Sequence, residues 1–271
     1  MADVWNQQAA QWERVGPPLR PSPEDLRHQQ RVARGWAACG RAPRILLLGV
    51  TPELALLQWP QPRSLLAVDL CADMIARVWP RRPDCADAVV RADWLELPLA
   101  DQSRDLVVSD GCFGVLGYPV QHRALLRSIR RVLTSDGRLV FRVFVRPQRG
   151  ELATDVYDQA MAGRIGSFHS FKLRLLMALQ ADITSGVRTG EVWENWMTHG
   201  PRPRDLVAAC GWKAEQIETI DAYRGQTTTY SFPTLGELRE LASQEGFEEL
   251  ECAWPGYESG DRCPTLVLSR R

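Results

Sequence analysis

Lysine is nearly absent from this 271-residue sequence, which contains only Lys172 and Lys213. Arginine supplies almost all of the positive charge, and Lys plus Arg and Asp plus Glu both total 33, so the formal net charge is zero. No long block of residues carries one sign of charge. Because binding to a polyanion depends on an excess of positive charge, a nucleic acid is not an expected partner.

Long hydrophobic runs are missing too. No stretch of about 18 apolar residues occurs, which is the length that a membrane-spanning helix needs, and residues 1–16 lack the apolar core of a signal peptide. We therefore expect a cytoplasmic protein without a membrane partner. The histidines are dispersed and no cysteine stands in a CxxC pair, so no metal site is predicted and reduced thiols are expected. The cysteines are Cys39, Cys71, Cys85, Cys112, Cys210, Cys252 and Cys263.

What the sequence does contain is a series of short apolar runs separated by helical segments. Each run is continuous rather than alternating, as in parallel strands whose two faces are both covered by helices. The runs are 45–48, 65–68, 88–90, 106–108 and 139–143, followed by a capped helix over 234–246 and runs at 250–253 and 265–268. The pattern predicts an α/β fold with a doubly wound, seven-stranded and mostly parallel sheet.

Four segments are expected along the chain. Residues 1–40 form an N-terminal helical arm, in which Ser22, Pro23 and Asp25 open a helix that runs to about Gly40. Residues 41–149 form the α/β core. Residues 150–231 have helical spacing and no clear strand, which predicts a helical insertion after the fifth strand. Residues 232–271 supply the last helix and two strands.

The ends of the strands are where ligands bind in open α/β sheets. After the first strand, Gly49 is followed by Thr51, a good N-cap residue, and by Glu53, which favours the positive end of a helix dipole. An ordinary strand–turn–helix explains these residues equally well. Asp69 ends the second strand, where a carboxylate accepts hydrogen bonds from both hydroxyls of a ribose or, alternatively, caps a helix.

Two further strand ends carry acidic residues. Asp93 directly follows the third strand and is placed to accept a hydrogen bond from an adenine amino group, with apolar neighbours such as Leu70 and Trp94 packing on the ring. Asp110 and Gly111 end the fourth strand; the glycine lets the backbone approach a reacting centre and Asp110 is a candidate to face the substrate. A turn-forming Asp-Gly pair is the alternative.

Together these blocks resemble one family. GVTPEL, AVDL, RADWLELPLADQSRDLVVSDG and LLRSIRRVLTSDGRLVFRVF resemble the class I S-adenosylmethionine-dependent methyltransferases over residues 44–146, and 234–268 match their last helix and strand pair. The resemblance implies a Rossmann-like fold, S-adenosylmethionine as cofactor, S-adenosylhomocysteine as product, and methyl transfer to a small molecule. It also implies a set of cofactor-binding residues: Gly49, Thr51, Glu53, Asp69, Leu70, Asp93, Trp94 and Asp110.

The first block departs from the family pattern. Leu47 stands where the family usually has an acidic residue, and Thr51 and Glu53 stand where it has glycines. The methionine end of the cofactor therefore needs another partner. Glu53, or Arg20 from the arm, is the candidate replacement.

Methyl transfer by in-line displacement depends mainly on alignment, with a general base needed only when the acceptor must lose a proton. The candidates for base or acceptor anchor are Asp110, His169 and His199, each of which also has an ordinary structural explanation. We expect the insertion to cover the reacting centre, with Phe168, Trp193 and Trp196 contacting the substrate. The alternative is that these aromatic side chains form a core of their own.

Two other functions compete with methyl transfer. A dinucleotide-dependent dehydrogenase shares the ribose carboxylate but needs a GxGxxG turn, and the proline and glutamate of GVTPEL disfavour one. A non-catalytic binding or regulatory module is the stronger alternative, because the first block is degenerate. Neither the acceptor nor the oligomeric state can be read from the pattern.

Overall fold

The computed structural model describes residues 2–38, 40, 42–61, 63–82 and 87–271. Cys39 and Cys85 of the predicted thiols lie outside these residues. The other five cysteines are free, as expected.

A seven-stranded sheet forms the core, with strand order β3-β2-β1-β4-β5-β9-β8. β1 to β5 pair in parallel, whereas β9 is antiparallel to both β5 and β8. This confirms the predicted α/β class and mostly parallel sheet. The strands are β1 Arg44–Leu48, β2 Ser64–Asp69, β3 Ala88–Arg91, β4 Arg104–Asp110, β5 Leu133–Arg142, β8 Phe247–Ala253 and β9 Thr265–Arg270.

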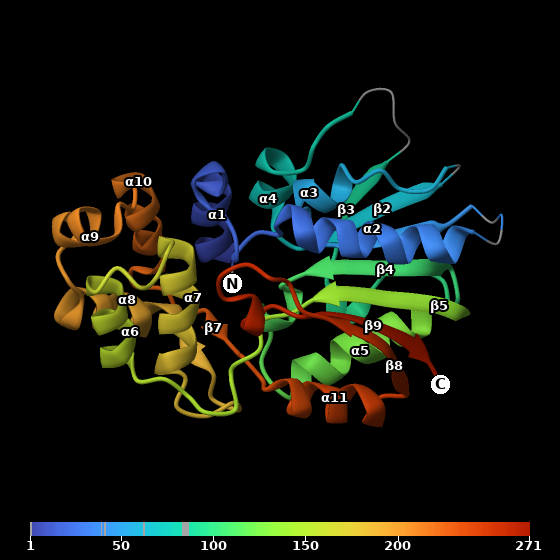
Figure 1. Ribbon diagram of the computed structural model, residues 1–271. Helices are drawn as coiled ribbons and strands as arrows, with labels where there is room; N and C mark the ends of the chain where they lie inside the picture. The colour runs from blue at the N-terminus through green and yellow to red at the C-terminus, as the bar shows by residue number, and fades with distance from the viewer. Residues whose placement is uncertain (1, 39, 41, 62, 83–86) are drawn as a thin grey trace.

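Helices cover both faces of the sheet (Figure 1). In β1, Ile45 and Leu47 pack against α2, α3 and α4, whereas Leu46 and Leu48 pack against α5 and α11. A continuous apolar run is required because successive side chains enter opposite layers. The helices of the arm and core are α1 Ala2–Ala10, α2 Pro23–Ala37, α3 Pro52–Ala55, α4 Ala72–Arg77, α5 Val120–Val132 and α11 Leu235–Gln244, with 3-10 turns at Trp12–Arg14, Trp94–Glu96, Cys112–Val115 and Gly260–Arg262.

Local signals fixed several helix ends. A capping box joins Ser22 and Asp25 at the start of α2, and another joins Thr234 and Glu237 at the start of α11. α2 ends at Ala37, earlier than the predicted Gly40, which itself has a φ of +78°. Thr51 precedes α3 as expected, but its side chain makes no capping hydrogen bond, so that part of the prediction was wrong.

A mainly helical group lies between β5 and α11, beside the carboxyl ends of β4 and β5 (Figure 1). The expectation that it contains no strand was wrong, because β6 and β7 pair as a short antiparallel ladder. α1 lies between this group and α4, and contacts both α4 and the 3-10 helix η4. The elements are α6 Ala153–Met161, α7 Phe168–Leu179, β6 Val187–Arg188, α8 Thr189–His199, α9 Pro203–Cys210, α10 Ala214–Ile217, η4 Glu218–Tyr223 and β7 Thr229–Tyr230.

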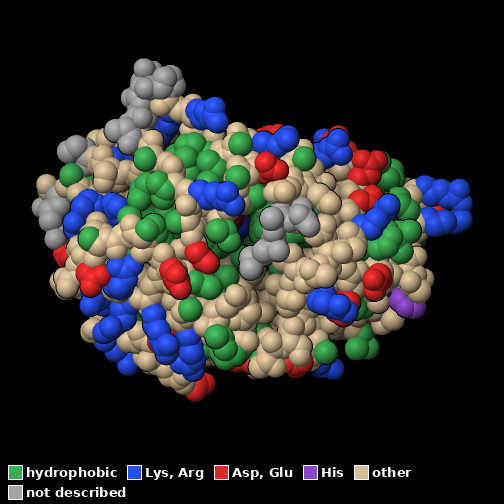
Figure 2. Space-filling view, turned by 180° about the vertical axis from the view of Figure 1, so that it is seen from behind, with side chains coloured by type: hydrophobic (Ala, Val, Ile, Leu, Met, Phe, Trp, Pro, Cys, Tyr) green, Lys and Arg blue, Asp and Glu red, His purple; other side chains and the backbone are tan. Residues whose placement is uncertain are grey.

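The surface mixes charges of both signs. On the face seen in Figure 2, arginine and lysine side chains lie among acidic ones and scattered apolar ones. In the part of the chain that the structure describes, no helix has the length and apolar character needed to span a membrane.

Candidate active site

Two adjoining cavities open at the carboxyl edge of the parallel strands. The larger, of about 460 Å³, is bordered by the ends of β2 and β3 and by α1. The smaller, of about 120 Å³, runs from the end of β1 to the inserted helices. Their linings share Trp5, Asp69, Trp94 and Val115, so the cavities meet at the end of β2.

Asp69 stands where the two cavities meet. Its side chain is buried, and one carboxylate oxygen accepts a hydrogen bond from the Cys71 amide at 2.8 Å. The other oxygen faces Gly49, at 3.9 Å from where a Cβ would stand. Gly49 has a φ of +89°, a conformation that disfavours any side chain. Burial raises the pKa of Asp69 to about 6, so near neutral pH this carboxylate is charged and presents one oxygen to a ligand.

The larger cavity has the character of a nucleoside site. Asp93, Trp94 and Leu70, the residues expected at the adenine end of a cofactor, all line it. The Asp93 carboxylate accepts from the Leu95 amide at 2.9 Å, which fixes its direction. The Trp94 indole donates to the Val68 carbonyl at 2.6 Å, so its ring is held as a rigid wall. A carboxylate beside fixed apolar surface is the combination that adenine recognition requires.

An ion pair joins the N-terminal arm to the segment GVTPEL, residues 49–54. Arg20 Nε lies 2.7 Å from Glu53 Oε1, and its guanidinium also donates to the carbonyls of Trp12 and Val15. The second carboxylate oxygen of Glu53, Oε2, is buried and has no hydrogen-bond partner in the described structure. A buried acceptor without a partner is costly, so Oε2 is suited to a donor supplied by a ligand. Leu47, by contrast, is a fully buried core residue.

Asp110 lines the smaller cavity but is not a free base. Its two carboxylate oxygens are both bound by the guanidinium of Arg142, with Nη2 at 3.0 Å from Oδ2. Arg142 is fully buried and also donates to the Pro18 carbonyl at 2.7 Å. Burial lowers the pKa of Arg142, but the Asp110 carboxylate outweighs it and raises that pKa well above its usual value. The expected catalytic role of Asp110 is therefore corrected to a structural ion pair.

The two candidate catalytic histidines line neither cavity. His169 is buried, and burial lowers its pKa to about 4, which leaves the ring neutral. His199 ends α8 on the exposed surface. Both predictions are corrected, because neither imidazole reaches the carboxyl edge of the sheet.

The aromatic residues predicted to contact substrate pack elsewhere. The Phe168 ring lies 6.0 Å from the Trp196 ring and 5.7 Å from that of Trp212, in a core internal to the insertion. The Trp193 indole donates to Asp221 at 2.9 Å, and the Arg224 guanidinium covers its ring. None of the three predicted residues lines a cavity at the carboxyl edge. For these three residues the packing favours the alternative, a core formed largely by the insertion.

The insertion does reach the smaller cavity, through residues other than the three that were predicted to contact the substrate. Lys172 of α7 lines it together with Tyr223, Tyr230 and Phe232. Lys172 is 1% exposed, and its Nζ donates to Thr219 Oγ1 at 3.0 Å. Burial lowers the pKa of this amine to about 7. The available signal was a lone lysine inside the apolar helical run 168–179.

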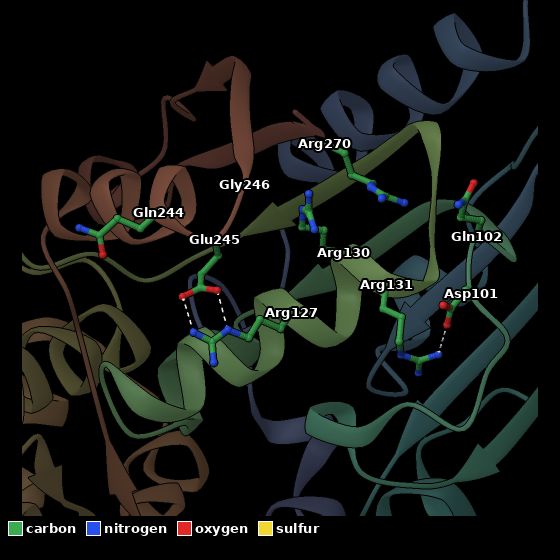
Figure 3. A pocket seen from close by; sticks show the side chains of 9 residues that line it. All are labelled: Asp101, Gln102, Arg127, Arg130, Arg131, Gln244, Glu245, Gly246 and Arg270. Carbon is green, nitrogen blue, oxygen red and sulfur yellow. Dashed lines mark hydrogen bonds and ion pairs between the residues drawn. The ribbon is translucent and has the colours of Figure 1, made fainter.

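A third and larger hollow, of about 580 Å³, lies away from this site (Figure 3). Its residues come from the loops before β4 and β8, from the second half of α5 and from the ends of α11 and β9, at the opposite edge of the sheet. Arg131 binds Asp101 at 2.8 Å and Arg127 binds Glu245 at 2.7 Å. These guanidinium groups join surface elements and contribute nothing to the carboxyl edge.

Comparison with known proteins identifies the domain and the fold. Residues 48–141 match the family model of a methyltransferase domain. A search of curated proteins found no match. Among solved structures, a 1,6-didemethyltoxoflavin-N1-methyltransferase from Burkholderia thailandensis, with 1,6-didemethyltoxoflavin and S-adenosylhomocysteine bound, has a TM-score of 0.54 and 16% identity; 98% of this chain and 87% of that chain are covered.

Two more structures share the fold. An S-adenosylmethionine-dependent methyltransferase from Mesorhizobium loti has a TM-score of 0.50 and 15% identity, with 89% of this chain and 96% of that chain covered. A Rhodobacter sphaeroides protein whose name refers to Zn-dependent alcohol dehydrogenases has a TM-score of 0.60 and 14% identity, with 98% of both chains covered. At these identities the structures establish the fold alone. The family model covers residues 48–141, and the chain therefore contains a methyltransferase domain.

Proposed function

We propose that the protein transfers a methyl group to a small molecule bound in the smaller cavity. The observation that carries this proposal is the continuity of that cavity, whose lining includes Gly49 and Asp69 on the cofactor side and Lys172 and Tyr223 on the side of the insertion. A cofactor held by the strand ends and an acceptor held by the insertion would then meet in one enclosed space. Such alignment supplies most of the catalysis in a displacement reaction.

The residues present fit S-adenosylmethionine. Asp69 would bind the ribose, and Asp93 and Trp94 the adenine. Glu53 lines neither cavity, but its Oε2 is buried without a partner and the nearby Thr51 lines the smaller cavity, so Oε2 would take the ammonium group. When bound, the cofactor supplies an electrophilic methyl group on a sulfonium. The chain's own contribution is to orient both molecules and exclude water, which Trp5 and Trp12 of the arm favour by covering the cavity.

Each of the predicted segments is assigned one part of the site. Residues 1–40 cover the site, 41–149 and 232–271 build the cofactor half, and 150–231 form the acceptor side. The Burkholderia relative supports a small acceptor, since its structure has 1,6-didemethyltoxoflavin bound together with S-adenosylhomocysteine.

A binding and transfer experiment tests the proposal. S-adenosylhomocysteine at a hundred times its Kd should stabilise the fold by about 2.7 kcal/mol, which is seen as a rise of several degrees in the melting temperature. Isotope-labelled methyl groups from S-adenosylmethionine should then appear on small molecules of a cell extract and not on tRNA, DNA or protein. A folded protein whose melting temperature is unchanged by either adenosyl compound would contradict the proposal, as would label found on a macromolecule.

Glu53 provides a second test of the cofactor site. Glu53→Gln removes the charge that we assign to the cofactor ammonium, and loss of a charge-assisted hydrogen bond of about 1.5 kcal/mol should raise the Kd for S-adenosylhomocysteine roughly ten-fold. Isothermal titration calorimetry measures this Kd. Because the variant also weakens the pair with Arg20, Arg20→Met is the matched control, and it should change the Kd much less. Equal changes of the Kd in the two variants would show that Glu53 only holds the arm in place and does not bind the cofactor.

A further inference from the structure

Lys172 is a buried amine on the cavity wall without an acidic partner in the described structure. Its Nζ donates to Thr219 Oγ1 at 3.0 Å, and that hydroxyl donates in turn to the Gln216 carbonyl at 2.7 Å. Thr219 therefore orients the amine but offers no negative charge. A buried ammonium group without a counter-charge is costly. Structural packing alone gives no reason for a lysine at this position.

We propose that Lys172 is the base that takes the proton of the methyl acceptor, and that the acceptor is a small flat aromatic molecule carrying an ionisable O–H or N–H group. The inference rests on the proposed function and adds to it the class of substrate and the residue that activates it. Its geometric basis is the position of Lys172 in the same enclosed space as Gly49 and Asp69.

The surroundings of Lys172 favour an aromatic acceptor. Its Nζ lies 5.4 Å from the centre of the Tyr223 ring, and the Tyr223 and Tyr230 rings meet edge to face at 6.3 Å. Phe144 and Phe232 extend this aromatic surface along the cavity. Within the described residues neither tyrosine hydroxyl has a hydrogen-bond partner, so both are free to bind polar atoms on the rim of a ring. Flat apolar walls with a few polar tips select planar ligands.

The groups that contact Lys172 supply no negative charge. His169, on the same helix, is itself neutral near pH 7, since burial lowers its pKa to about 4. Burial raises the pKa of Tyr223 and of Tyr230, so both stay protonated. Across the cavity, Asp110 is neutralised by Arg142. The titratable groups that line the cavity or adjoin Lys172 are Asp69, Asp110, Cys112, His169, Tyr223 and Tyr230.

A neutral amine is what proton abstraction requires. Burial lowers the pKa of Lys172 to about 7, so a large share of the molecules carry the unprotonated amine at neutral pH. In the reaction, the acceptor O–H or N–H proton passes to Lys172 Nζ while the acceptor lone pair forms the bond to the methyl carbon. The carbon–sulfur bond breaks, and its electron pair returns to the sulfur, which becomes a neutral thioether. Solvent then removes the proton from the ammonium group.

The test compares Lys172→Met with Lys213→Met, which changes the only other lysine of the chain, an exposed one. The probes are 4-nitrophenol, 8-hydroxyquinoline and benzimidazole, each added to protein saturated with S-adenosylhomocysteine. For 4-nitrophenol, the visible absorption of the phenolate reports proton transfer directly. We expect the wild-type protein and Lys213→Met to increase the phenolate fraction at pH 7, and Lys172→Met to abolish the increase.

Turnover with S-adenosylmethionine supplies the second readout. Loss of a general base costs roughly 10²-fold or more in kcat, so kcat of Lys172→Met should fall by that factor while its Kd for S-adenosylhomocysteine stays within two-fold. The wild-type kcat should rise as the pH increases through about 7, and the variant should lack this rise. Lys172→Arg, which keeps a positive charge but cannot accept the proton, should be as slow as Lys172→Met.

Several results would overturn the inference. Activity retained in Lys172→Arg would show that Lys172 only attracts an acceptor that is already an anion. If kcat and phenolate formation were unchanged in Lys172→Met, Lys172 would not take part in the proton transfer. Failure of all three probes to bind while S-adenosylhomocysteine binds would exclude the acceptor class. Failure of S-adenosylhomocysteine itself to bind would contradict the proposed function, and so the two ideas fail in distinguishable ways.

Discussion

Replacing Arg142 with methionine should lower the melting temperature by roughly 10 °C. The substitution leaves Asp110 buried without the partner that binds both of its oxygens. Removing one member of a buried ion pair destabilises a protein by about 3–5 kcal/mol, and each kcal/mol corresponds to roughly 2–4 °C in a domain of this size. Because Arg142 also donates to the Pro18 carbonyl, the arm should lose protection from proteolysis in the same variant.

Differential scanning calorimetry of three variants isolates the cause. Adding Asp110→Leu to Arg142→Met removes the stranded carboxylate, so the double variant should recover most of the lost stability. Arg127→Met is the control for loss of an arginine from an ion pair; because the Arg127 side chain is exposed, this variant should change the melting temperature little. A double variant no more stable than Arg142→Met alone would show that packing, and not the uncompensated charge, is responsible.

The sheet was predictable because its signals are local. The run at 45–48 is continuous, and its alternate side chains enter two different layers of the core. The capping boxes at Ser22 and Thr234 each use residues only three apart. Such features depend on neighbours in the chain and are unaffected by the tertiary fold.

The part of the site formed by the strand ends was predictable for a related reason. In a parallel sheet, residues that follow consecutive strands meet at one edge, so Gly49, Asp69 and Asp93 had to lie near one another. The same rule could have identified the ion pair, because Asp110 and Arg142 are register partners at the ends of β4 and β5. An arginine opposite an aspartate at a strand end was an available signal, but the two residues lie 32 positions apart in the sequence.

The part of the cavity formed by the insertion was not predictable, since it depends on which face of each inserted helix turns inward. Helical spacing places Phe168 and Lys172 one turn apart on α7, yet Phe168 enters the core of the insertion and Lys172 reaches the cavity. The partners that fix Lys172, Thr219 and Tyr223, belong to a 3-10 helix nearly fifty residues away. Spacing alone does not show where distant elements pack.

Asp69→Asn should raise the Kd for S-adenosylhomocysteine roughly 10-fold to 100-fold. Asparagine keeps the size of the side chain and the acceptor for the Cys71 amide, but it replaces the second carboxylate oxygen, which faces Gly49, by an amide group that donates. Loss of a charged acceptor costs about 1.5–3 kcal/mol. Titration calorimetry at pH 7.5 measures the Kd, and Asp101→Asn, an exposed change at the opposite edge of the sheet, should leave it unchanged.

The pH dependence of binding tests whether Asp69 binds the ribose without any substitution of the side chain. Since burial raises the pKa of Asp69 to about 6, its carboxylate is charged at pH 7.5 and largely protonated at pH 5. A bound ribose favours the charged form, so the wild-type Kd should be constant above about pH 7 and should increase as the pH falls through 6. Asp69→Asn should lack this increase. If the Kd of the wild-type protein and that of Asp69→Asn increase in parallel between pH 7 and pH 5, another group controls the affinity and Asp69 does not bind the ribose.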